Sequence, residues 1–133
     1  MTKLQLHAII VYATLTLGTV VTAAKIAPPK PVVPVEANGV RYSADRDGSD
    51  QYAVAIDIAT GKQLWKVKVF HTHIKFWIEE DVQWVFITDL KLMDSSLFVR
   101  DGKARCYAVD INSHRVRKAP CSVAFGQQER ASQ

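Results

Sequence analysis

The sequence has little of what enzyme active sites usually contain. It has no Gly-rich phosphate loop, no Cys-x-x-Cys pair, and no Ser-His-Asp or Cys-His arrangement at a recognisable spacing. No carboxylate stands within an apolar stretch, apart from Asp89 in a strand-like pattern. We therefore expect no catalytic residue and no cofactor.

The chain also lacks a concentrated charge of one sign. Its formal net charge is +4, which is small for 133 residues. Nucleic-acid-binding domains normally carry a dense basic patch, and here the one local basic run is residues 114–118, which we interpret as part of a solvated tail. We expect no nucleic-acid partner.

Prolines are few and almost all lie together. Four of the five fall between Ile26 and Val35. Proline fixes φ and removes a backbone donor, so this composition predicts an extended, polyproline-like spacer over residues 25–35.

Long apolar runs are limited to the N-terminus. Lys3 precedes an uncharged run over residues 8–21, and the small residues Thr22, Ala23 and Ala24 offer a cleavage site. This pattern predicts a signal peptide over residues 1–24 and a periplasmic or extracellular protein, with no stable membrane span after cleavage. The alternative is an uncleaved anchor, because the run is only slightly shorter than the roughly 20 residues that a membrane helix needs.

The clearest structural pattern is the stretch from Gln51 to Phe70. Residues 52–58 and 65–69 alternate with the period of two that a half-buried strand requires, and a tight turn separates them. The pattern predicts a β-hairpin with Tyr52, Val54 and Ile56 on the core face. The predicted core consists of Tyr52, Val54, Ile56, Trp65, Val67, Val69, Trp84, Phe86, Leu90, Tyr107 and Val109.

Part of this hairpin matches a known repeat. Residues 55–65 read A-x-D-x-x-T-G-x-x-x-W, with Ala55, Asp57, Thr60, Gly61 and Trp65 in place. The motif resembles the repeat of quinoprotein β-propeller blades. The resemblance implies a structural role, in which Asp57 and Thr60 hold the turn and Trp65 packs between blades.

A propeller needs several such repeats, and the motif occurs once in a chain too short for a ring of blades. An isolated blade-like partner of a quinoprotein is therefore an alternative function. From Asn38 onward the pattern is also similar to small exported bacterial β proteins of uncharacterised function.

Further strands are indicated on both sides of the hairpin. Asn38-Gly39 predicts a tight turn, residues 82–93 predict the longest strand, and residues 94–111 predict two more strands around a turn at Asp101-Gly102. We expect an all-β fold, a single antiparallel domain over residues 36–118 with six or seven strands in a curled sheet or partly open barrel. Residues 119–133 are expected to form a partly disordered tail.

The two cysteines form the most informative pair. In an exported protein Cys106 and Cys121 are expected to form a disulfide that fastens the tail to the last strand. The alternative is that both remain free, because the tail is mobile and Cys106 lies among small residues.

The segment His71 to Asp81 fits neither a strand nor a helix period, and it combines aromatic, basic and acidic groups. We predict a binding site there, formed by Phe76, Trp77, Glu79 and Glu80, in a small exported non-catalytic binding or accessory module. Its partner would be an envelope or secreted protein. In the alternative interpretation, Phe76 or Trp77 covers one end of the sheet.

A third function rests on the pair His71 and His73. Two histidines on one strand face have the spacing of metal ligands, and Glu79, Glu80 or Asp81 would supply an oxygen. The sequence thus leaves a metal-binding protein open as an alternative.

Overall fold

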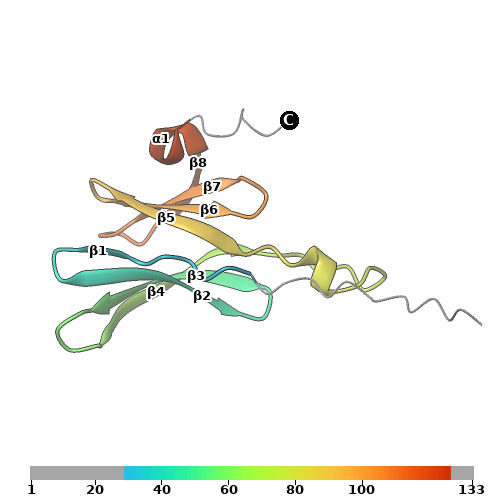
Figure 1. Cartoon of the computed structure of the whole chain (residues 1–133), viewed down its shortest axis with the longest axis horizontal. Coiled ribbons are helices and arrows are strands. Elements are labelled where there is room, and N and C mark those ends of the chain that lie inside the picture. Colours follow the sequence, from blue (N-terminus) through green and yellow to red (C-terminus); the bar gives the residue numbers. More distant parts are fainter. Residues whose placement is uncertain (1–28, 127–133) are drawn as a thin grey trace, which may run out of the picture.

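Two four-stranded antiparallel sheets, layered face to face, make up the fold (Figure 1). The computed structural model describes residues 29–126, so the predicted signal peptide and the last seven residues lie outside it. The first sheet contains β1 (Val35–Ala37), β2 (Val40–Asp47), β3 (Asp50–Asp57) and β4 (Gln63–His71). The second contains β5 (Ile87–Met93), β6 (Ser96–Asp101), β7 (Cys106–Asp110) and β8 (Val116–Ala119), and a short helix, α1 (Cys121–Phe125), follows.

The prediction of an all-β fold is confirmed, but its finer form was wrong. The described residues form eight strands in two open sheets, not six or seven strands in one curled sheet or barrel. Each sheet is a simple meander in which spatial order follows chain order. The difference arises because β8 is a short edge strand with two exposed basic residues, which carries almost no hydrophobic signal.

The core lies between the facing sides of the two sheets. Sheet one contributes Tyr42, Ala53 and Ala55, and sheet two contributes Leu97, Val99, Tyr107 and Val109. Phe70 of β4 stacks on Tyr107 of β7 with ring centroids 5.2 Å apart, which joins the sheets across the interface.

The predicted core face of β3 turns away from the second sheet, although Val54 on that face is buried as predicted. Ala53 and Ala55 are fully buried in the inter-sheet core, whereas Tyr52 and Ile56 are only half-buried on the other face. In the β3–β4 register Ala55 lies opposite Trp65 and Ala53 lies opposite Val67. Small alanines beside large neighbours leave room for the second sheet, so residue size, and not hydrophobicity alone, decides which face is inside.

The predicted long strand over residues 82–93 was also wrong. A 3-10 turn, η1 (Asp81–Gln83), occupies its beginning, and β5 starts only at Ile87. The core positions are Val85 and Ile87, while Trp84 and Phe86 are half-buried outside the core cluster. A register shift between Ile87 and Asp89 then brings Leu90 to the core side.

The two outer faces differ strongly. On sheet two, α1 places Ala124 against Phe98 and Ala108 and so forms a second, smaller apolar cluster. On sheet one the outer face carries ion pairs, from Lys66 Nζ to Asp45 at 2.7 Å and from Lys68 Nζ to Asp50 at 3.2 Å.

The β7–β8 turn repeats the geometry of the β3–β4 turn. Asp57 N donates to Lys62 O at 2.8 Å and Gly61 N to Asp57 O at 2.8 Å. The matching bonds in the second sheet run from Asp110 N to Arg115 O and from His114 N to Asp110 O, at 2.9 and 2.8 Å. Gly61 and His114 both have positive φ, 70° and 60°. Sequence reasoning missed this second turn because it lacks the Thr-Gly pair and the tryptophan.

Candidate binding site

Residues 72–86, here called the arm, connect β4 of the first sheet to β5 of the second. In Figure 1 the arm extends beyond the ends of both sheets, with η1 at its base and a loop beyond it. It contains all four residues that the sequence predicted for a binding site.

Gln83 holds the arm in one conformation. Its Oε1 accepts a hydrogen bond from Lys75 N at 2.8 Å, and its Nε2 donates to Lys75 O and Ile78 O, both at 2.9 Å. A third acceptor, Glu79 O, lies 3.3 Å from Nε2. One half-buried side chain thus replaces the ladder hydrogen bonds that an irregular segment lacks.

The arm presents its aromatic side chains to solvent. Phe76 is 93% exposed and Trp77 is 67% exposed. Their rings meet edge to face with centroids 4.9 Å apart. The alternative prediction, that one of them covers an end of the sheet, was therefore wrong.

Further apolar and acidic groups lie beside this aromatic pair. Ile78 and Val82 are also exposed, by 41% and 56%. Glu79 and Glu80 stand between them in the sequence and are exposed. The four predicted residues therefore lie on one short, protruding segment whose apolar groups have acidic neighbours.

The base of the arm and the proline-rich segment line a common cavity. Trp84 and Phe86 stack with centroids 6.0 Å apart, and the Arg46 guanidinium lies 5.1 Å from the Phe86 ring centroid. Pro29 and Lys30 line a cavity of about 470 Å³ together with Trp84 and Phe86. Val32 packs against the core. The predicted spacer over 25–35 thus contacts the body at its end, a contact that proline composition does not reveal.

His71 is engaged in an ion-pair network. Its Nδ1 lies 2.7 Å from Asp50 Oδ1 and 3.4 Å from the Ser49 hydroxyl. The hydrogen bond from His71, followed by the one from Lys68, holds the pKa of Asp50 below its usual value. Over residues 29–126 no group of three or more His, Cys, Asp or Glu side chains is arranged to hold a metal ion. Metal binding by His71 and His73 stays a prediction.

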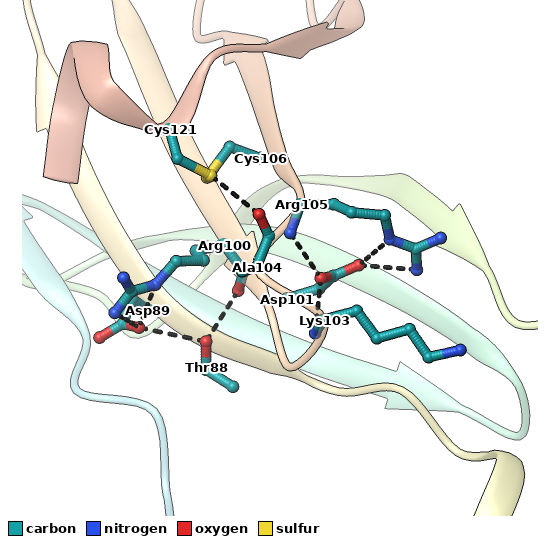
Figure 2. The surroundings of a disulfide bond; sticks show 9 residues. All are labelled: Thr88, Asp89, Arg100, Asp101, Lys103, Ala104, Arg105, Cys106 and Cys121. Carbon is teal, nitrogen blue, oxygen red and sulfur yellow. Dashed lines mark hydrogen bonds and ion pairs between the residues drawn. A yellow bond between two sulfur atoms is a disulfide. The ribbon is translucent and has the colours of Figure 1, made fainter. Parts of the chain in front are cut away.

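The predicted disulfide between Cys106 and Cys121 is confirmed, with Cα atoms 5.2 Å apart (Figure 2). It fastens the start of α1 to the start of β7. Next to it, the fully buried carboxylate of Asp101 accepts hydrogen bonds from Lys103 N at 2.9 Å and from Arg105 N at 3.0 Å. The loop that joins β6 to β7 is thus stabilised by the Asp101 carboxylate and by the disulfide that follows it.

The turn motif of the first hairpin has the contacts that its residue types suggest. Asp57 Oδ2 accepts from the Thr60 hydroxyl at 3.0 Å, and its Oδ1 accepts from Ala59 N at 3.1 Å. Trp65 packs on Tyr42, and also on His114 in the β7–β8 turn, with centroid distances of 6.0 and 5.0 Å. The tryptophan of the first sheet therefore contacts the corresponding turn of the second.

Within the described range, 29–126, no helix has the length and apolar character needed to cross a membrane. No protein-family model matches the chain, and no curated protein matches it significantly. A function must therefore be argued from the geometry.

Proposed function

We propose that this chain is a small exported, non-catalytic binding module that docks on a partner protein through the tip of its arm. The observation that carries the proposal is the exposure of Phe76 and Trp77 on a segment that Gln83 holds in place. The proposal keeps the four residues that the sequence indicated, namely Phe76, Trp77, Glu79 and Glu80.

Exposure of two large aromatic rings favours binding over a purely structural role. Apolar surface in water gains free energy when a partner covers it, at about 25 cal/mol per Å². Aromatic side chains have few rotatable bonds, so ordering them at an interface costs little entropy. The clamp made by Gln83 lowers that cost further, because the backbone is already in one conformation.

The charges around the tip indicate the chemistry of the partner. Three consecutive acidic residues, Glu79, Glu80 and Asp81, follow the aromatic pair and Ile78, and all three are exposed. A partner that offers an apolar pocket rimmed by lysine or arginine would match both features. An envelope or secreted protein fits, because the disulfide is consistent with an oxidising compartment.

Capture from envelope extract with the mature domain as bait tests this function. We expect one partner to be retained by the wild type and lost with Trp77→Ala, with little change in the free energy of unfolding. Leu64→Ala is the matched control, since Leu64 is 53% exposed at the far end of β4. Glu79→Gln with Glu80→Gln should weaken capture and reduce its salt dependence.

Equal capture by wild type, Trp77→Ala and Leu64→Ala would remove the arm from the binding site. A large loss of stability in Trp77→Ala would show that the residue has a structural role instead.

A blade-like partner of a quinoprotein is the second candidate. The repeated turn and the packing of Trp65 on His114 support it, because blade tryptophans in that family are expected to pack between neighbouring blades. Further blades would have to stack on the outer faces of the two sheets. The outer face of sheet one carries ion pairs, and α1 covers that of sheet two, so neither face favours stacking. Sedimentation of the mature chain separates the two functions, since a detached blade should associate with copies of itself, whereas a folded monomer would argue against the blade.

A further inference from the structure

A second candidate site lies where the arm meets the β6–β7 loop. There the end of β4, the base of the arm and residues 103 and 105 enclose a pocket of about 410 Å³. Its basic lining residues are His71, His73, Lys75, Lys103 and Arg105, and no carboxylate is among the lining residues. We call this the cationic pocket. It adjoins the exposed tip, since Lys75 Nζ lies 5.9 Å from the Trp77 ring centroid, but Phe76 and Trp77 do not line it.

Two of the pocket's charges are not neutralised by the protein. Arg105 pairs with Asp101, and His71 pairs with Asp50. In contrast, no ion pair of Lys75 or Lys103 is found among residues 29–126. Like charges drawn together without a counter-charge repel one another, so an anion bound among them gains attraction and relieves that repulsion.

The backbone segments that carry these charges are held by local hydrogen bonds and by the disulfide. Asp101 and the adjacent disulfide fix the loop 102–105, and in Figure 2 the Lys103 and Arg105 side chains extend from it toward the same side. On the opposite wall, Gln83 fixes the backbone of Lys75 through two hydrogen bonds. Because the backbone on both walls is already ordered, binding of an anion needs to order only the lysine side chains, and less entropy is lost.

The remaining lining residues define the rest of the ligand. Ile78, Val82 and Val85 give the pocket an apolar wall. Thr72, which is 8% exposed, has a hydroxyl without a hydrogen-bond partner in the described structure. The volume falls in the range of small-molecule sites, which is about 300 to 1,000 Å³.

We infer that the cationic pocket binds a small amphiphilic anion, a carboxylate or phosphate group on a short apolar chain. The anionic group would lie between Lys75 and Lys103, and the chain would lie along Val82 and Val85. A headgroup of either kind has the required chemistry, because both are oxyanions that lysine binds through charge-assisted hydrogen bonds.

Calorimetric titration of the mature chain with octanoate, octyl phosphate and inorganic phosphate tests the inference and distinguishes the headgroups. We expect saturable binding of octanoate or octyl phosphate, weaker binding of inorganic phosphate, and no binding of octylamine. Lys103→Gln and Lys75→Gln should each weaken binding about tenfold, which corresponds to about 1.4 kcal/mol for one lost charge-assisted contact. Lys62→Gln is the matched control. Lys62 is exposed and immediately precedes β4, whereas the pocket lies at the other end of that strand, so this substitution should leave the affinity unchanged.

Absence of binding for both octyl anions would overturn the inference, and so would an equal loss of affinity in Lys62→Gln. Competition on the wild-type protein gives a test that needs no variant to fold, because inorganic phosphate should displace octanoate. Failure of that competition would place the octanoate at an apolar surface and not in this pocket. Lys103→Gln should weaken anion binding without changing capture of the docking partner, because Lys103 lies on the β6–β7 loop and not on the arm, so failure of the docking function and failure of the pocket are distinguishable.

Discussion

At the scale of single residues, aspartates at strand ends determine where the chain reverses. Asp57, Asp101 and Asp110 each accept backbone N–H groups of the residues that follow them. These amides point away from the sheet ladders and would otherwise lack partners. The same residue type therefore closes the β3–β4, β6–β7 and β7–β8 turns.

Asp110 provides a test of this role through pH. Backbone hydrogen bonds from Ser113 and Asn112 hold its pKa below the usual value of about 3.9 for an aspartate. Its stabilising contribution is therefore complete above that value and is lost as pH falls through the folded-state pKa. We expect Asp110→Asn to lower the free energy of unfolding at pH 7 and to matter less at pH 3, as measured by urea unfolding.

Asp94→Asn is the control for that experiment. Asp94 is exposed, has φ of 51°, which asparagine tolerates, and makes no side-chain hydrogen bond within residues 29–126. Equal pH dependence of the two variants would contradict the assignment to the Asp110 turn.

At the scale of elements, the arm is ordered by one side chain and not by a sheet. The four hydrogen bonds of Gln83 all lie within the arm. Val85 is the one residue of the arm in the core cluster between the sheets, as far as residues 29–126 show. Order in the arm and stability of the sheets should therefore be separable.

Gln83→Ala tests that separation. We expect faster hydrogen exchange of the Lys75 amide and faster proteolysis within residues 72–86, because the backbone loses its acceptor and its donors. The free energy of unfolding should fall by only about 1 kcal/mol. Gln83→Glu is the matched variant, since it keeps the acceptor for Lys75 N and loses the donors. Unchanged exchange at Lys75 in both variants would show that something other than Gln83 orders the arm.

At the scale of the whole molecule, two similar sheets are completed in different ways. The second sheet carries α1, which the disulfide fastens over Phe98 and Ala108. The first sheet has an outer face of ion pairs that remains in water. Each sheet thus has one face in the common core. The other face is covered by a helix in the second sheet and carries ion pairs in the first.

Removal of the disulfide tests how far the helix contributes. The bond closes a loop with a sequence separation of 15 residues, for which the chain-entropy model gives about 3 kcal/mol. We expect the variant Cys106→Ala/Cys121→Ala to lose about 2 to 3 kcal/mol and still fold, because neither cysteine lies in the inter-sheet core cluster. A denaturant midpoint equal to wild type would contradict this, and a thiol count on denatured, unreduced protein should find no free thiol.

The sequence by itself determined the local features of this protein. The period of two over residues 51–70, the Asn38-Gly39 turn and the pairing of Cys106 with Cys121 all rest on short-range rules of backbone geometry or on composition. The irregularity of the arm was also visible, because its residues fit neither regular period. These features do not depend on the tertiary contacts between the strands and the sheets.

Only the tertiary structure decided which faces are inside and how the strands divide. Both faces of β3 are apolar in sequence, and the second sheet covers the one with Ala53 and Ala55, where small alanines beside Trp65 and Val67 leave room for it. β5 starts only at Ile87, after an arm in which Gln83 contacts Lys75 eight residues earlier, a contact that no period of two indicates. The placement of Lys75 and Lys103 in the lining of one pocket likewise depends on how the arm and the β6–β7 loop of the second sheet come together, which no local period encodes.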